Sequence, residues 1–379
     1  MKDQYEIEVF CPAAPPAMSN WLAENGVKVI RGDFVPTMMS HYNGDAKFFL
    51  SPRTLRYLKN VKLKKNWHEI EKAIETSKPD VVAVNSMTLS WMGPLLKEKN
   101  ITSVCFHRET YAKGLLGIRT NQIKKWLRHY FDAVIFISKY DQDVTGHLKG
   151  RGTVITDKVD LELYSKQQGE GLRKTLGMEE HCFYTAYLGG IYELKGAHVI
   201  LKAMSLIKDP EIRLLFLQFN RQKTLKTFAE CQGIREKIRF LLGMDYEAKV
   251  LKLIQELNLW ERVDFFPSTT KPEAYITASD VIVFPSIEPH QARPLYEAGA
   301  AKRPIIITDF KQTREFAKDQ VNALTFENLN PQALASKIIL LKENHELYQT
   351  LVANNYAQSC NNHQMASLAQ ELDEVFQKL

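Results

Sequence analysis

The 379-residue sequence has few cysteines, and none of them form a close pair. The five are Cys11, Cys105, Cys182, Cys231 and Cys360. Because an odd, scattered set suits neither a disulfide framework nor the paired spacing of a zinc site, both kinds of crosslink are disfavoured. We therefore expect a reducing compartment, the cytoplasm, and predict no metal site.

Long apolar runs are also missing. No stretch approaches the roughly 18 consecutive apolar residues that a membrane-spanning helix needs. The first residues, MKDQYEIEVF, lack the basic-then-apolar layout of a signal peptide. We expect a chain that does not span a membrane and is not secreted by that route.

No apolar strand pattern is followed by the glycine spacing G-x-G-x-x-G. That spacing lets a backbone approach the pyrophosphate of a dinucleotide. Its absence argues against a nicotinamide-dependent dehydrogenase.

What is present fits two globular α/β domains. The apolar share of 45% and the charged share of 25% are ordinary for globular proteins, and 379 residues suffice for two cores. Short apolar runs alternate with helical patterns, which predicts βαβ units and parallel sheets. The expected strands read YEIEVFCP, VKVI, DVVAVNS, SVCFH, AVIFIS and GTVIT in the first half, then FYTAYLGG, LLFLQF, VDFFPS, VIVFPS and PIIITD.

The polar segment 160–180 separates the two sets of strands and suits an inter-domain connection. We predict an N-terminal Rossmann-like domain at 1–163 and a C-terminal one at 164–362. The terminal segment 363–379 has helical apolar spacing and is expected to complete the first domain.

The positive charge lies in the first half. Residues 1–165 hold 24 Lys and Arg against 18 Asp and Glu, which accounts for the formal net charge of +6. Two basic segments interleaved with aromatic residues, 47–67 and 118–131, are candidates for contact with an anionic membrane surface. A solvated helix face is the alternative interpretation of both. No recognisable nucleic-acid-binding module accompanies the charge, so nucleic acid is not an expected partner.

Residues 281–309, VIVFPSIEPHQARPLYEAGAAKRPIIITD, are the most informative stretch. Two buried-type strands flank a loop and a short helix, which Arg293-Pro294 opens with proline at a favourable first-turn position. Backbone N–H groups at a helix start attract phosphate. A carboxylate just inside the helix, Glu297, can accept hydrogen bonds from the hydroxyls of a ribose.

This stretch resembles the donor-site signature of retaining glycosyltransferases of the GT-B fold, particularly glycosyltransferase family 4. In that pattern a strand is followed by Pro-Ser, then by two glutamates separated by seven residues, then by Ala. Residues 285–286 and 297–298 match it. The resemblance implies two Rossmann-like domains that face each other across a cleft, with Glu297 on the donor ribose.

The match has departures. The first glutamate of the pattern is expected at Pro289, and Glu288 lies one residue earlier. The glycines that usually follow are replaced by His290 and Ala292. The resemblance assigns Glu288 a place in the catalytic centre.

A second motif, YLGGIYELKGAHVILKAM, resembles the family's Gly-Arg followed by Lys-Gly. Gly189 and Gly190 would let the backbone approach the donor, and Lys195 would neutralise charge on the departing diphosphate. Gly190 stands where the family has arginine. Arg293 is the preferred substitute for that arginine, and Arg221 is the alternative.

Three further segments complete the expected site. His107, at the end of SVCFH, matches a histidine that contacts the donor sugar in similar enzymes, and Glu109 is an acceptor-side candidate. Thr269 lies in the segment that resembles the base-binding loop. Asp141 follows Ser138 by three residues, which predicts a helix cap and not a metal ligand.

Together these motifs indicate a retaining hexosyltransferase. Its expected donor is a nucleoside diphosphate sugar, and its expected acceptor is a glycan or lipid-linked molecule at the cytoplasmic membrane face, as in polysaccharide biosynthesis. The alternative is a GT-B-like scaffold without transfer activity. No cofactor is expected beyond the donor substrate.

Overall fold

The computed structural model describes residues 5–11, 16–32, 67–111, 117–218, 233, 237 and 246–379. The chain divides into two compact units, and each is described by itself. Unit 1 comprises Met1–Thr156 with Leu368–Leu379, and unit 2 comprises Asp157–Ser367. Both have parallel sheets with helices, so the predicted α/β class with two Rossmann-like units is confirmed.

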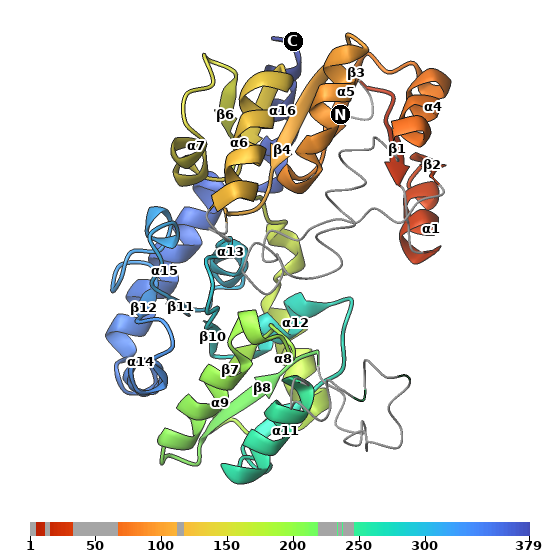
Figure 1. Cartoon of the computed structure of the whole chain (residues 1–379). Coiled ribbons are helices and arrows are strands. Elements are labelled where there is room, and N and C mark those ends of the chain that lie inside the picture. The colour runs from red at the N-terminus through yellow and green to blue at the C-terminus, as the bar shows by residue number, and fades with distance from the viewer. Residues whose placement is uncertain are drawn as a thin grey trace. The chain divides into compact units, whose positions relative to one another are not determined.

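Unit 1 contains a four-stranded parallel sheet, in the order β3-β4-β5-β6, and a separate parallel pair, β1-β2, among its described residues. Figure 1 labels most of these elements along the chain. The strands are β1 (Glu8–Cys11), β2 (Lys28–Arg31), β3 (Val81–Val84), β4 (Thr102–His107), β5 (Ala133–Phe136) and β6 (Gly152–Val154). The helices are α1 (Pro16–Glu24), α4 (Trp67–Ser77), α5 (Gly93–Glu98), α6 (Ile118–Tyr130), α7 (Lys139–Thr145) and α16 (Leu368–Phe376).

Both faces of the unit 1 sheet are covered. Val134 and Phe136 of β5 pack on one face with Leu127 of α6. On the other face Ile135 of β5 joins Leu372 of α16. Because alternate strand residues point to opposite faces, the fully apolar β5 sequence is what a sheet covered on both sides requires.

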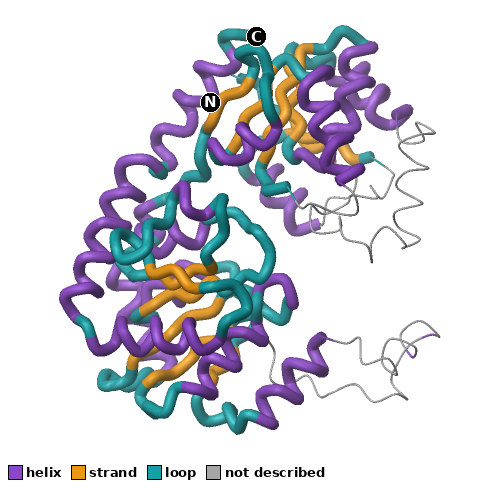
Figure 2. The backbone as a smooth tube through the Cα atoms, turned by 60° about the vertical axis from the view of Figure 1, so that its left-hand side comes forward, coloured by secondary structure: helices purple, strands orange, loops and turns teal. Residues whose placement is uncertain are grey.

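Unit 2 is built on a parallel sheet whose six described strands run in the order β12-β11-β10-β7-β8-β9. The strands are β7 (Phe183–Tyr187), β8 (Ile212–Phe216), β9 (Val263–Phe265), β10 (Val281–Phe284), β11 (Ile305–Thr308) and β12 (Leu324–Phe326). The helices are α8 (Lys166–Leu176), α9 (Ala197–Leu206), α11 (Tyr246–Glu256), α12 (Pro272–Ala278), α13 (Arg293–Ala300), α14 (Pro331–Glu343) and α15 (His345–Asn362). Figure 2 shows helices flanking the strands on both sides.

This strand order reverses direction at β7. From β7 the chain builds outward through β8 and β9, then returns to the other side of β7 with β10. In doubly wound sheets, ligands bind outside the carboxyl ends of the strands at such a switch point. The fold therefore directs attention to the segments that follow β7 and β10.

The segment 160–180, which we expected to hold the inter-domain connection, contains a helix. Ser165 caps α8, and its Oγ accepts from the Gln168 N–H at 3.4 Å. Gly169 brings this helix against Thr277 of α12, where an added Cβ would lie 2.7 Å from the Thr277 carbonyl oxygen. The segment is thus a packed part of unit 2.

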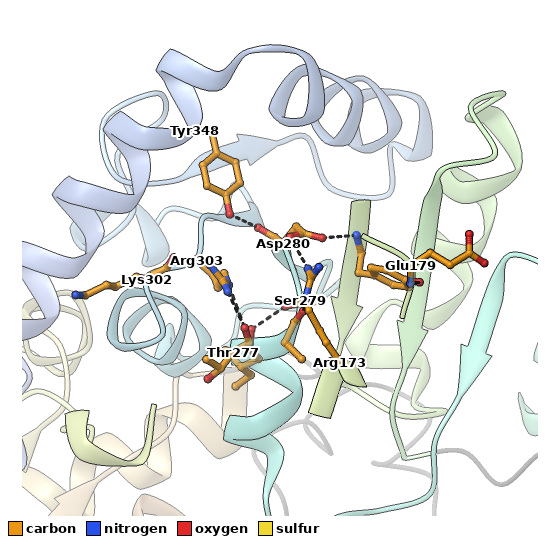
Figure 3. Close-up of polar contacts among 11 residues, drawn as sticks. Arg173, Glu179, Thr277, Ser279, Asp280, Lys302, Arg303 and Tyr348 are labelled. Carbon is orange, nitrogen blue, oxygen red and sulfur yellow. Dashed lines mark hydrogen bonds and ion pairs between the residues drawn. The ribbon is translucent and has the colours of Figure 1, made fainter. Parts of the chain in front are cut away.

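The amino end of β10 is held by a network around Asp280 (Figure 3). The Arg173 guanidinium pairs with Asp280 Oδ1 at 2.6 Å and donates to the Ala278 carbonyl. The Tyr184 N–H donates to Asp280 Oδ2 at 2.7 Å, and the Tyr348 hydroxyl donates to the Asp280 carbonyl at 2.9 Å. The Asp280 carboxylate and the carbonyl groups of Ala278 and Asp280 therefore all have hydrogen-bond partners within unit 2.

Helix α13 is held by close contact with α15. An added Cβ on Gly299 would overlap Ser359 Oγ and lie 2.6 Å from the Asn355 carbonyl oxygen. Asn355 Nδ2 donates to the Leu295 carbonyl at 3.0 Å. This packing fixes the helix that carries Glu297. No helix in the described part of the chain is long and apolar enough to cross a membrane.

Candidate functional site

Two loops meet at the switch point of unit 2. One follows β7 and ends in the 3-10 turn Glu193–Lys195, and the other follows β10 and leads into α13. The Ile287 N–H donates to the Leu194 carbonyl at 3.0 Å, and Ser286 Oγ donates to the same carbonyl at 3.1 Å. The two predicted donor motifs are therefore joined by hydrogen bonds, although they are about a hundred residues apart in the sequence.

Gly196 permits this approach. Its φ is +76°, in the left-handed region, and an added Cβ would overlap the Pro285 carbonyl oxygen. No residue with a side chain fits there without a shift of the backbone. The Lys195-Gly196 pair predicted from the sequence thus has a structural reason for its glycine.

Lys195 is a partly buried cation in this junction. Its ammonium contacts His290 Nε2 and lies 5.4 Å from the centre of the Phe284 ring. Burial lowers the pKa of Lys195 to about 8. No carboxylate in the described part of the chain forms an ion pair with it, so none of these residues supplies an anion for its positive charge.

Glu297, one turn into α13, does have a partner. Arg293 Nε donates to Glu297 Oε1 at 2.9 Å, and the glutamate side chain is 18% exposed. Burial raises the pKa of Glu297, and Arg293 opposes this shift. The predicted ribose ligand and the predicted phosphate cation are therefore brought together, but as an ion pair with each other.

The two glycines after β7 are tightly enclosed. An added Cβ on Gly189 would lie 2.6 Å from Tyr187 Cζ. Gly190 has a φ of +63°, and a Cβ there would lie 2.9 Å from Cβ of Gln218. An arginine at position 190 would be strained, which gives the departure from the family pattern a physical reason.

The remaining candidates described in unit 2 take part in local hydrogen bonds. Glu288 is an exposed residue of the β10–α13 loop, and its carbonyl accepts from Ser286 Oγ at 2.7 Å. Thr269 Oγ1 accepts from the Lys271 N–H at 3.0 Å, just before α12. Arg221, the alternative phosphate ligand, lies outside the described residues.

His107 ends β4 of unit 1 and is fully buried. Its ring lies 4.7 Å from that of Tyr111 and 5.1 Å from that of Phe136. Neither ring nitrogen has a hydrogen-bond partner among the described residues, and burial lowers the pKa of His107 to about 3. The imidazole is therefore neutral at ordinary pH.

Glu109 lies two residues after His107. Its carboxylate is held by residues at the start of the 3-10 segment Met87–Met92. Ser86 Oγ donates to its Oε1 at 2.5 Å, and the Met87 N–H donates to its Oε2 at 3.1 Å. Burial raises the pKa of this carboxyl. The hydrogen bonds fix the side chain within unit 1.

The predicted cap at Ser138 is confirmed, and a second cap lies at Asp160. Ser138 Oγ accepts from the Asp141 N–H at 3.0 Å and donates to Asp141 Oδ2 at 2.6 Å. Asp160 accepts from the Glu162 N–H at 3.1 Å and caps the following 3-10 turn. Both aspartates thus take part in the hydrogen bonds that begin a helix or a 3-10 turn.

The structure describes only one of the two basic segments in full. Nearly all of 47–67 lies outside the described residues. Segment 118–131 forms α6, which buries Ile123 and Leu127 in the core. Arg128 of this helix donates to the Thr145 carbonyl at 2.8 Å, so part of its charge serves the fold of unit 1.

Sequence reasoning missed His290. Its ring lies edge-on to Phe284, with centroids 5.5 Å apart, and its Nε2 meets Lys195. In the sequence it is only a residue in place of a glycine. Lys195 is 95 positions away, and the pairing of β7 with β10 is what brings the two residues together.

Comparison with known proteins agrees with the motifs. Residues 242–358 match the sequence model of the family described as glycosyl transferases group 1. D-inositol 3-phosphate glycosyltransferase of Salinispora arenicola is 23% identical over 233 residues, which cover 59% of this chain and 48% of that protein. The Corynebacterium urealyticum protein of the same name is 24% identical over 245 residues, covering 61% and 52%. The chain thus spans about half the length of the curated relatives it matches.

Solved structures extend the likeness to the fold. HepE of Anabaena in complex with UDP has a TM-score of 0.75 at 18% identity, covering 98% of this chain and 92% of that one. Sucrose-phosphate synthase from Thermosynechococcus elongatus has a TM-score of 0.73 at 18% identity, covering 100% and 90%. The resemblance to group 1 glycosyltransferases and the GT-B fold are both confirmed.

The close approach at Gly196 predicts a large cost for Gly196→Ala. We expect the free energy of unfolding to fall by about 3 kcal/mol or more, because strain in the left-handed region adds to the overlap with Pro285. Gly177→Ala is the matched control, since Gly177 also has positive φ but nothing within 4 Å of its added Cβ. It should cost about 1 kcal/mol. Equal losses in chemical denaturation would contradict the close contact.

Proposed function

We propose that this chain, whose residues 242–358 match the group 1 glycosyltransferases, transfers a sugar from a nucleoside diphosphate sugar to a glycan or lipid-linked acceptor with retention of configuration. The observation that carries the proposal is Lys195. A partly buried ammonium without an anionic partner among the described residues lies at the sheet's switch point. A diphosphate supplies the missing negative charge.

The donor would be held by groups of unit 2. Lys195 would neutralise the charge that develops on the leaving diphosphate, which favours the transition state over the ground state. The start of α13 would offer backbone N–H groups to the same phosphates. Glu297 would accept hydrogen bonds from the ribose hydroxyls, with its carboxylate kept in place by Arg293.

We assign His107 to the donor sugar and Glu109 to the acceptor, and Glu288 to the loop that grips the sugar. The proposal invokes no metal, because Lys195 and α13 provide the positive potential. An acceptor at the cytoplasmic face of a membrane would suit a peripheral contact through 47–67 and 118–131, as in polysaccharide biosynthesis.

A second function is favoured by two observations. Glu297 is already paired with Arg293, and the conformation of Gly190 disfavours the family's arginine. A GT-B-like scaffold that has lost donor binding would carry such features. Nucleotide binding separates the two functions.

Hydrolysis of nucleotide sugars without an acceptor tests the proposal directly. UDP-glucose is the first donor to try, because the Anabaena protein HepE has been solved with UDP-glucose. We expect slow release of the nucleoside diphosphate from at least one sugar of a panel that varies base and sugar. No release and no calorimetric binding by any donor would favour the scaffold.

Lys195→Met should separate binding from stability. We expect UDP affinity to fall by about tenfold or more, because the cation proposed to neutralise the diphosphate is lost. The free energy of unfolding should rise by about 1–2 kcal/mol, because a charge held at a lowered pKa is replaced by an apolar side chain. Calorimetry and thermal unfolding measure the two effects. A loss of both would indicate that Lys195 is a structural residue.

The lowered pKa of Lys195 predicts how UDP affinity depends on pH. The ammonium binds the diphosphate, so affinity should be complete well below pH 8 and fall as pH rises through about 8. The contribution of this group to folding has the opposite sign: its destabilising effect is present below about pH 8 and is relieved as pH rises toward 10.5. Titration calorimetry between about pH 7 and about pH 9 checks this, and Lys195→Met should abolish the fall.

A further inference from the structure

His290 is placed to control Lys195. It lies in the loop between β10 and α13, where the family's pattern has a glycine, and its Nε2 contacts the Lys195 ammonium. The ring also packs edge-on against Phe284, with an interplanar angle of 84°. Phe284 in turn lies 5.4 Å from the ammonium. The lysine is therefore bounded by an imidazole and by an aromatic ring.

The hydrogen bond between Lys195 and His290 can have only one donor. An ammonium group has only donors, so His290 Nε2 must be the acceptor and the neutral ring carries its proton on Nδ1. Burial lowers the pKa of His290 to about 4, which keeps the ring neutral at ordinary pH. The imidazole can therefore hold the cation without repelling it.

Other ionisable groups near the lysine do not replace His290. Glu193 lies in the same 3-10 turn, His198 follows in α9, and Glu288 lies in the facing loop. Neither glutamate forms an ion pair with Lys195, and the His198 ring is hydrogen-bonded to the Tyr246 hydroxyl. A lysine side chain has a flexible stem that loses substantial entropy when it is fixed. The acceptor on His290 is what restricts it.

We propose that His290 is a positioning residue for the donor diphosphate: by accepting a hydrogen bond from Lys195, it holds the ammonium at the switch point before the donor arrives. This inference deepens the proposed function and rests on it. Fixing the cation in advance removes an ordering cost from donor binding, and affinity rises by that amount. In this chain the residue in place of the family's glycine thus becomes a support for the lysine.

A double-mutant cycle tests the coupling. UDP binding is measured by calorimetry for the unaltered protein, His290→Phe, Lys195→Met and the double variant. His290→Phe keeps a ring of similar size but has no acceptor, so affinity should fall about fivefold to tenfold. In the Lys195→Met background the same substitution should change affinity by less than about twofold. His290→Gln, whose amide oxygen can accept, should restore most of the affinity. Equal losses in both backgrounds would overturn the proposal.

A second measurement does not depend on UDP. The pKa of Lys195 is followed by isotope-edited NMR of the lysine ε-carbon in the unaltered protein, His290→Phe and His290→Gln. We expect His290→Phe to lower this pKa, because the acceptor that stabilises the ammonium is gone, and His290→Gln to leave it nearly unchanged. An unchanged pKa in His290→Phe would overturn the positioning role.

The two measurements separate the two hypotheses. If the unaltered protein binds no nucleotide while the NMR shift appears, the proposed function fails and the contact with Lys195 stands. If UDP binds but neither coupling appears, the function stands and the role of His290 fails. Should His290→Phe unfold in the thermal control, His290→Leu has the same lack of an acceptor and takes its place.

Discussion

The parallel pairing of β7 with β10 is the constraint on which the candidate site depends. The register places Val281 beside Thr185 and Ile282 beside Ala186, so both strands end at the same edge of the sheet. Their loops must then pass each other within contact distance, and Gly196 against Pro285 is the point where they meet. Lys195 and His290 become neighbours as a consequence of this backbone geometry.

The charged groups at the two ends of β10 differ in their partners. At the amino end the Asp280 carboxylate is satisfied by Arg173 and by a backbone N–H (Figure 3). At the carboxyl end Lys195 has an imidazole but no anion among the described residues. Burying an unpaired charge opposes folding, so a protein keeps one where the cost is offset by function. This asymmetry favours the carboxyl edge of the sheet as the position of the proposed donor site.

Much of this fold could be predicted from the sequence, because apolar runs such as VIVF have one explanation in a sheet covered on both faces. Proline at the first turn of α13 and the Lys195-Gly196 pair were equally informative. Other features depend on partners far along the chain. β12 has only three residues and was not expected. The segment of α8 was assigned to the inter-domain connection, because its polar sequence gives no sign of the packing on α12. The contacts of Lys195 with His290 and of Arg293 with Glu297 follow from side-chain positions that no spacing rule encodes.

Helix α16 has a consequence for the order of folding. Leu372 and Val375 cover Ile135 and Val104, yet they are translated after all of unit 2. During synthesis these two residues become available to the sheet of unit 1 only after more than two hundred further residues have emerged. Unit 2 is continuous in sequence and can close its own core first. The packing of α16 on unit 1 can therefore be completed only after unit 2 has been translated.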